Sequence, residues 1–185
     1  MKLTATKRAE MKKSAVKEVR RQGNIPAILY SANNEAQSLV VPGIEFNTIL
    51  REMQPGMLST MVFELSIDGK KVRAIIKDIQ YQLTNYQVSH LDFQELIDTA
   101  PVTVNVRVNC IGVMDCIGIK LGGFLRQVSR HIKVQCLPKH LPKEFVVDVK
   151  NLGIRQAIRR SDIEMPQGVK ALTPATEVLV VIAKK

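Results

Sequence analysis

The chain has 185 residues, a hydrophobic fraction of 45% and a formal net charge of +10. This length allows one domain or two small ones, and the positive charge favours an acidic partner such as nucleic acid. The longest apolar runs fall short of the roughly 18 residues that cross a membrane, and the N-terminus lacks the apolar segment of a secretory signal. Three cysteines without a C-x-x-C pair favour a reducing cytoplasm over a disulfide framework.

The first thirty residues form the most basic stretch of the chain. They contain eight lysines and arginines, opposed only by Glu10 and Glu18. The predicted elements of this stretch are a strand at Lys2–Arg8, a helix at Ser14–Gln22 that stops at Gly23, and a strand at Ile25–Tyr30. A basic segment that leads into a strand with a terminal aromatic residue is typical of a nucleic-acid-binding surface. A solvated basic tail is the alternative interpretation.

The following residues complete a first unit, which we expect to span residues 1–97. A helix is predicted at Ile44–Met53, with an inward stripe made of Ile44, Ile49, Leu50 and Met53. The pair Asp68-Gly69 predicts a type I′ turn between two strands, because both central positions of that turn need a positive φ. The predicted strands of this segment are Ser38–Pro42, Met61–Ile67, Lys70–Gln80 and Tyr86–Phe93.

The residues from Asp98 onward predict a second, β-rich unit spanning 98–185, joined to the first near Ala100-Pro101. Its predicted strands are Val102–Val108, Ile132–Leu137, Phe145–Val149 and Glu177–Ala183. The remaining segments of interest are a helical turn or two at Leu152–Arg160 and a flexible glycine-rich loop at Gly118–Gly123. The predicted fold class is therefore mainly β with short helices (α+β).

One group of polar residues stands out on two of the predicted strands. If these strands form an antiparallel hairpin centred near Asn85, Asp78 faces Asp92 and Gln80 faces His90. Two carboxylates directly opposed in a sheet are unfavourable, so the cluster favours a role in binding a partner. That partner is either a substrate, with His90 as base and Asp92 orienting it, or the edge of a nucleic-acid base. A solvated strand face with internal hydrogen bonds is the third interpretation.

The sequence offers little for an enzyme or a metal protein. No convincing nucleophile accompanies His90 and Asp92. The spacing of His131, Cys136 and His140 matches no structural zinc pattern, so we expect no metal and no cofactor. A hydrolase that uses the His–Asp pair therefore stays a rival hypothesis without further support.

Short motifs spread over nearly the whole chain resemble those of a known family. They include NIPAILY at Asn24–Tyr30, IDGKK at Ile67–Lys71, KDIQ at Lys77–Gln80, HLDF at His90–Phe93 and PQGV at Pro166–Val169, with KSAVKEVRR at Lys13–Arg21 and CLP at Cys136–Pro138. The chain resembles the bacterial large-subunit ribosomal protein that binds 5S ribosomal RNA, in its long two-domain form, the L-twenty-five/CTC general stress protein family. Val16, Glu18 and Tyr81 depart from the residues that this family usually has.

The resemblance implies an N-terminal six-stranded β-barrel with helices that binds 5S rRNA, followed by a C-terminal β-rich domain of the long form. It implies a non-enzymatic constituent of the 50S ribosomal subunit, located in the cytoplasm, without a membrane and monomeric when free. A stress-related RNA-binding or interaction protein that acts off the ribosome is the alternative. The RNA-binding residues implied by the family's motifs are Arg8, Lys13, Lys17, Arg20, Tyr30, Lys77, Gln80, His90 and Asp92.

Overall fold

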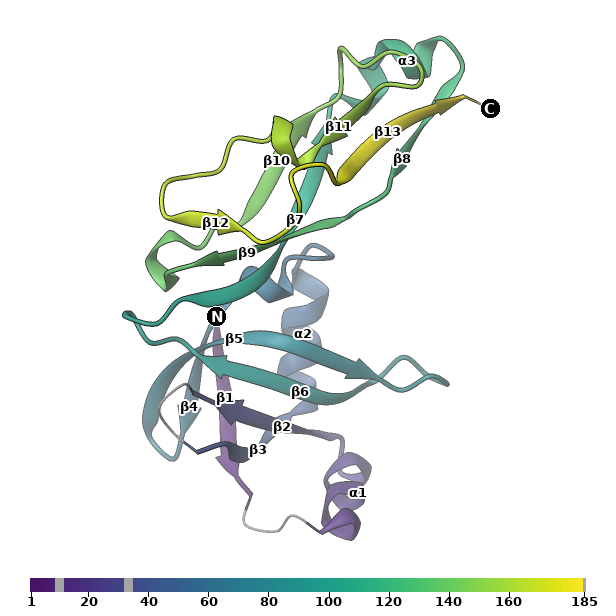
Figure 1. Ribbon diagram of the computed structural model, residues 1–185. Coiled ribbons are helices and arrows are strands. Elements are labelled where there is room, and N and C mark those ends of the chain that lie inside the picture. Colours follow the sequence, from purple (N-terminus) through teal and green to yellow (C-terminus); the bar gives the residue numbers. More distant parts are fainter. Residues whose placement is uncertain (9–11, 32–34, 185) are drawn as a thin grey trace. The chain divides into compact units, whose positions relative to one another are not determined.

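A computed structural model describes residues 1–8, 12–31 and 35–184, and the chain divides into two compact units, Met1–Ala100 and Pro101–Lys185 (Figure 1). Strands dominate both units, so the predicted fold class, mainly β with short helices, is confirmed. None of the helices among these described residues is long and apolar enough to cross a membrane.

The first unit is a closed six-stranded barrel, as predicted, with the strand order β1-β3-β2-β6-β5-β4. Its strands are β1 (Lys2–Lys7), β2 (Asn24–Tyr30), β3 (Gln37–Pro42), β4 (Val62–Ile67), β5 (Lys70–Tyr81) and β6 (Val88–Glu95). Its helices are α1 (Lys13–Arg21), α2 (Gly43–Glu52) and the short 3-10 helix η1 (Leu58–Thr60). Alternate strand residues fill the barrel, where the edge of the Phe63 ring meets the Phe93 ring.

Turn chemistry sets two of the strand connections. Asp68 and Gly69 both have positive φ, 47° and 84°, which confirms the predicted turn between β4 and β5. Between β5 and β6 the backbone N–H of Gln82 donates to the carbonyl of Gln87, so the second hairpin turns around Asn85 as predicted. The predicted start of β6 at Tyr86 was too early, because Tyr86 itself adopts a turn conformation with φ 54°.

Helix α2 packs on the barrel through a residue other than the one predicted. Phe46 is fully buried in the barrel core, and Ile49 and Leu50 pack beside it. Ile44, expected on the inward stripe, is 83% exposed. The helix begins at Gly43, so Phe46 takes the inward position of the first turn and Ile44 points away from it.

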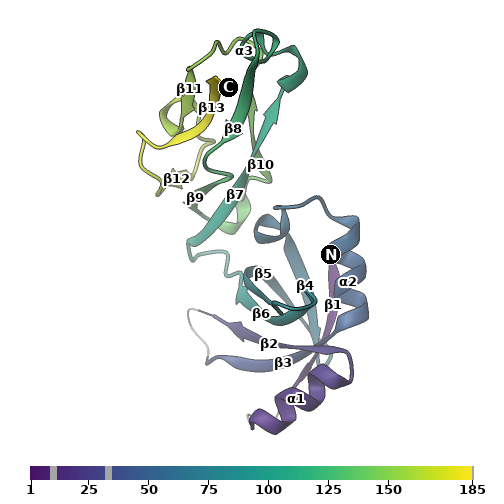
Figure 2. The ribbon, with the colours of Figure 1, turned by 90° about the vertical axis from the view of Figure 1, so that its right-hand side faces the viewer.

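The two helices meet through a close backbone contact. Gly23, which follows α1, has φ 79° and so stops that helix as predicted. Gly43 opens α2, and a Cβ atom at that position would collide with the carbonyl oxygen of Gly23. Glycine is therefore required at Gly43 for the end of α1 and the start of α2 to lie together (Figure 2).

The second unit consists of two sheets. The four-stranded sheet has the order β10-β7-β9-β12, and the three-stranded sheet has the order β11-β13-β8. The strands are β7 (Val102–Ile111), β8 (Gly123–Gln127), β9 (His131–Cys136), β10 (Glu144–Asp148), β11 (Ala157–Arg159), β12 (Val169–Ala171) and β13 (Val178–Lys184). The helical segments are α3 (Ile117–Lys120) and the 3-10 helices η2 (Val113–Asp115), η3 (Pro138–His140) and η4 (Arg160–Asp162).

Two predictions for this unit were wrong. The segment Leu152–Arg160 forms no α-helix; it contains β11, where Ile158 pairs with Val180, and its last residue opens η4. The glycine-rich run Gly118–Gly123 is not a flexible loop, because it contains most of α3 and the first residue of β8. Its glycines serve close packing instead: a Cβ at Gly118 would meet the Ile182 side chain and the Leu152 carbonyl.

Candidate nucleic-acid interface

The predicted pairing of polar residues on β5 and β6 is confirmed. Asp78 lies opposite Asp92, and Gln80 lies opposite His90, in an antiparallel ladder. Strand β2 runs parallel to β6 on its other side and places Ile28 beside Asp92. We call the group Tyr30, Asp78, Gln80, His90 and Asp92 the outer polar face, because it lies outside the barrel on these three strands while Leu29, Leu91 and Phe93 fill the interior.

A β-bulge makes this face possible. The register of β5 against β6 shifts between Ile76 and Asp78, so Lys77 is an extra residue. Before the bulge the even-numbered residues Ala74 and Ile76 are buried; after it the even-numbered Asp78 and Gln80 are exposed. An unbroken period of two would have sent both polar side chains into the core. Lys77 is exposed at the bulge.

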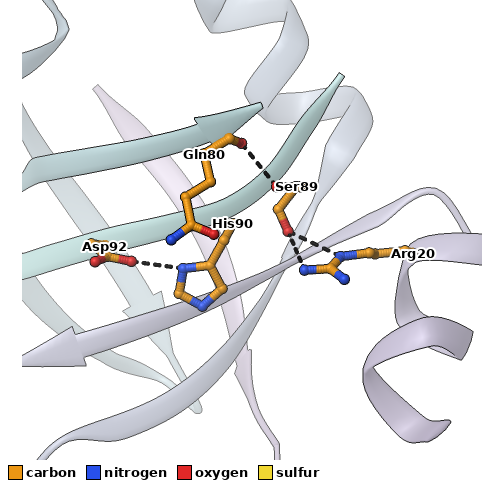
Figure 3. A network of polar contacts seen from close by, with 5 residues as sticks. All are labelled: Arg20, Gln80, Ser89, His90 and Asp92. Carbon is orange, nitrogen blue, oxygen red and sulfur yellow. Dashed lines mark hydrogen bonds and ion pairs between the residues drawn. The ribbon is translucent and has the colours of Figure 1, made fainter. Parts of the chain in front are cut away.

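His90 and Asp92 form a direct side-chain contact. The His90 Nδ1 lies 2.6 Å from Asp92 Oδ1, and both side chains are only partly exposed, at 26% and 30%. The carboxylate fixes the orientation of the ring and leaves Nε2 as the second polar atom of the imidazole. Figure 3 shows this pair beside Gln80, with Arg20 and Ser89 close by. The pair therefore presents fixed hydrogen-bonding groups rather than mobile side chains.

Tyr30 belongs to the same electrostatic environment. Burial raises the pKa of its phenol, and the negative charges of Asp92 and Asp78 raise that pKa further. The hydroxyl group therefore stays protonated at neutral pH and keeps its ability to donate a hydrogen bond. This places the last aromatic residue of β2 with the carboxylates of β5 and β6.

Helix α1 supplies the cations next to this face. Lys13, Lys17 and Arg20 are exposed and follow a spacing of four and three residues, which puts them along one side of the helix. Arg20 also donates from Nε and Nη2 to the carbonyl oxygen of Ser89, at 3.1 and 2.9 Å. Ser89 immediately precedes His90, so Arg20 ties the C-terminal end of α1 to the edge of the outer polar face (Figure 3).

Arg8 is the remaining predicted cation. Its backbone N–H donates to Ser38, and Ser38 pairs with Ile28, which lies beside Asp92. Arg8 therefore lies level with Asp92, with β3 and β2 between them. The Nε and Nη1 atoms of Arg8 are buried, yet no described residue accepts a hydrogen bond from them. A buried guanidinium without an acceptor is costly alone, and a phosphate oxygen is the acceptor that suits it.

Some polar groups near the site were missed by sequence reasoning. Gln94 continues the alternation of His90 and Asp92 along β6 and lies beside Tyr30, and its Oε1 atom is buried without a described partner. The period of two on β6 could have identified it. Ser89 is a second such residue: its carbonyl accepts hydrogen bonds from Arg20, and its hydroxyl donates to the carbonyl of Gln80. No sequence signal identifies a backbone acceptor of this kind.

The described residues contain no group of three or more histidines, cysteines, aspartates or glutamates that could hold a metal ion. Cys110, Cys116 and Cys136 are free thiols, and burial raises the pKa of Cys110 and Cys136. A raised pKa keeps these thiols protonated and weakly nucleophilic.

Fold and site together define a basic protein of two β-rich units, whose N-terminal barrel carries a polar outer face with a cationic helix beside it. Residues 3–93 match the Ribosomal L25p family, and residues 101–185 match the C-terminal domain of ribosomal protein TL5. The large ribosomal subunit proteins bL25 of Chlamydia muridarum and Chlamydia pneumoniae are each 43% identical over 185 residues, which is the full length of both chains compared. That of Chlamydia abortus is 41% identical over the same length.

The chain belongs to the bL25 family of ribosomal proteins, in the long form that carries a TL5-type C-terminal domain. The predicted family is thereby confirmed. This is a family of ribosomal proteins and not of enzymes, so the hydrolase hypothesis for His90 and Asp92 is set aside. The RNA contacts of the nine predicted residues stay predictions.

Proposed function

We propose that this chain is a constituent of the large ribosomal subunit in the cytoplasm and binds 5S ribosomal RNA through the outer polar face and α1 of its first unit. The observation that carries the proposal is the combination on one side of the barrel of an oriented His90–Asp92 pair and cations that lie next to it. The names of the full-length relatives, all large-subunit ribosomal proteins, support the same assignment.

The proposed mechanism divides the contacts into two kinds. Lys13, Lys17 and Arg8 neutralise phosphates and fix the position of the RNA on the barrel. Gln80, His90 and Asp92 read base edges or 2′-hydroxyls in a widened, non-canonical groove, because such positions in RNA expose hydrogen-bonding groups that a regular A-form helix hides. Tyr30 donates its phenolic hydroxyl or stacks, and Lys77 at the bulge adds a cation beside Asp78.

Arg20 has a double role in this proposal. Its two hydrogen bonds to Ser89 hold α1 against the barrel, and the guanidinium retains further N–H groups that a phosphate can accept. Arg20→Lys keeps the charge but loses the two-atom contact with the carbonyl. If positioning dominates, Arg20→Lys weakens RNA binding nearly as much as Arg20→Ala does.

The test uses the full chain, purified 5S rRNA and, as competitor, a transfer RNA, which is a folded RNA of another shape. Binding of 5S rRNA that persists in excess transfer RNA supports the proposal. Equal affinity for both RNAs would mean that the outer polar face and α1 bind polyanions without preference for 5S rRNA. Sedimentation with 50S particles then separates a ribosomal constituent from a protein that acts off the ribosome. A chain that never co-sediments with 50S particles would contradict the ribosomal assignment.

A further inference from the structure

The second unit contains a groove that the RNA-binding proposal does not use. The groove has a volume of about 340 Å³ and lies beside β10, with the β11–η4 segment on its other side. Strand β10 is the edge strand of the four-stranded sheet, and β11 is the edge strand of the three-stranded sheet. The groove therefore lies where the edges of two sheets approach each other without pairing.

The edge strand β10 has backbone hydrogen-bonding groups that point away from β7, the strand that it pairs with. Val149 donates its N–H to Ile111 of β7, so the odd-numbered residues of β10 direct their backbone groups toward β7. In a parallel ladder alternate residues point the opposite way, which directs the N–H and C=O of Glu144, Val146 and Asp148 outward. Such an edge is a template for an added strand.

The lining of the groove indicates what kind of strand fits it. Among the nine described residues that line it, four are acids and none is basic: Glu144, Asp148, Asp162 and Glu164. These are four of only six acids between positions 101 and 185, where fourteen residues are lysine or arginine. Apolar groups from Val146, which is 54% exposed, Ile158 and Ile163 lie between the carboxylates.

Three of the four acids have hydrogen-bond partners that fix their positions. Asp162 accepts hydrogen bonds from the backbone N–H of Arg159 and the hydroxyl of Ser161, which lower its pKa and keep it ionised. Asp148 accepts from the backbone N–H of Lys150, and Glu144 accepts from the Asn109 amide. The lining holds four acids and no basic residue, so the groove is acidic in a chain whose net charge is +10.

We propose that this groove binds an extended, lysine- and arginine-rich protein segment, which adds to the free edge of β10 as a further strand. The main-chain groups of Glu144, Val146 and Asp148 would pair with the segment, and its cationic side chains would lie among the four carboxylates. The repulsion of a basic segment by the rest of the chain is short-ranged at physiological salt, where the screening length is about 8 Å. This proposal does not depend on RNA binding by the first unit.

The experiment measures binding of a fluorescent hexapeptide, Lys-Val-Lys-Val-Arg-Val with blocked termini, to the full chain by anisotropy at physiological salt. The same peptide with every backbone nitrogen methylated carries equal charge but cannot pair as a strand. We expect the methylated peptide to bind at least about 10-fold more weakly. Equal binding of both peptides would reduce the groove to a site of simple charge attraction and overturn the proposal.

Two protein variants test the groove itself. Val146→Pro removes an outward N–H without touching the ladder to β7, since proline is tolerated at such edge positions. This variant should weaken peptide binding by about 10-fold. In the parent chain, bound peptide should slow hydrogen exchange of the Val146 amide. Glu164→Gln leaves the backbone intact and should weaken peptide binding by about threefold. Glu177 is an acid outside the groove, so Glu177→Gln should leave peptide binding unchanged.

Three results would count against the proposal. The first is that Val146→Pro, confirmed as folded by circular dichroism, would bind the peptide as tightly as the parent chain does. The second is that Glu164→Gln would have the same affinity for the peptide as Glu177→Gln. The third is that the two groove variants would weaken binding to 5S rRNA and leave peptide binding unchanged, which would assign the groove to nucleic acid.

Discussion

The two units of this chain are both β-rich and both basic, yet they place charge in different ways. In the first unit the cations gather on α1 and at Arg8, around a face where Asp78 and Asp92 lie opposite each other. In the second unit the cations are distributed along the sequence, and four of the six acids gather in the groove beside β10. Net charge alone would assign both units to nucleic acid. The arrangement of charge relative to strand faces and edges distinguishes the surface that we propose for RNA from the groove that we propose for a peptide.

The largest expected effect comes from separating the units. A fragment of residues 1–100 should fold alone and bind 5S rRNA nearly as tightly as the full chain, and a fragment of residues 101–185 should bind at least about 100-fold more weakly. The first fragment should extend to residue 100, because Arg73 pairs with Asp98 at 2.8 Å and Leu96 is buried. Filter binding measures both affinities. If the first fragment folded but did not bind 5S rRNA, or if the second fragment bound it as tightly as the first, the two units would not differ in the way that we propose.

Gly43→Ala should destabilise the first unit alone. The added methyl group collides with the Gly23 carbonyl and forces the ends of α1 and α2 apart, at a cost on the order of 2–3 kcal/mol. Thermal unfolding of the full chain followed by amide resonances of each unit would show an earlier transition for the first unit only. Asn47→Ala, at an exposed position of α2, serves as control and should leave the midpoint almost unchanged. A common shift of both units would mean that they unfold together.

Asp92→Asn separates specific recognition from charge. Loss of a negative charge near a polyanion should strengthen binding on Coulomb grounds, but we expect binding to weaken by about 1–3 kcal/mol because a base-specific acceptor and the orientation of His90 are lost. The dependence of affinity on salt should stay the same. Glu52→Gln, an exposed acid at the end of α2, is the matched control and should bind as well as the parent or slightly better. Tighter binding of Asp92→Asn would show that the carboxylate is merely tolerated.

Lys13→Ala and Lys17→Ala should act through phosphates. Each should lower the slope of log K against log salt by somewhat less than about one unit. Lys71→Ala removes an equally exposed cation near the β4–β5 turn and should leave the slope unchanged. Affinity measured between low and physiological salt gives the slopes. Equal slopes for all three variants would mean that Lys13 and Lys17 contribute no more phosphate contacts than Lys71 does.

The smallest effect concerns Tyr30. Because the charge of Asp92 contributes to the raised pKa of this phenol, Asp92→Asn should lower the pKa while burial keeps it above the usual value of 10.0. Ultraviolet titration at alkaline pH compares the variant with the parent chain, and Tyr30→Phe identifies the signal. If the pKa of Tyr30 were unchanged in Asp92→Asn, the charge of Asp92 would have no effect on the Tyr30 phenol.

Local rules predicted much of the barrel and of the site. Asp68-Gly69 and the symmetry of residues about Asn85 predicted two hairpins, and the second hairpin placed Asp78 opposite Asp92 correctly. The bulge at Lys77 could not be predicted, because the apolar residues before it and the polar residues after it follow the same even numbering. Choosing Ile44 over Phe46 failed for a related reason: the position at which a helix begins sets which residues face inward, and helix starts are weakly encoded.

The contacts that depend on tertiary packing were beyond the sequence. The bond from Arg20 to the Ser89 carbonyl joins elements 69 positions apart and has no residue-type signature. The run Gly118–Gly123 has the composition of a loop but packs against Ile182, a contact that only the folded second unit creates. Long-range burial, rather than local propensity, decided both cases.

The bulge at Lys77 decides which side of the barrel the end of β5 presents. With Lys77 as the extra residue, Ile76 lies inside and Asp78 and Gln80 lie outside, although all three have even numbers. Deleting Lys77 should therefore remove the bulge and still leave Asp78 and Gln80 outside, because plain alternation after Ile76 sends them there. Straightening the strand with all its residues kept would instead turn both polar side chains into the phase of the core. For this strand, the extra residue and the register shift decide which face Asp78 and Gln80 occupy, and their own identity does not.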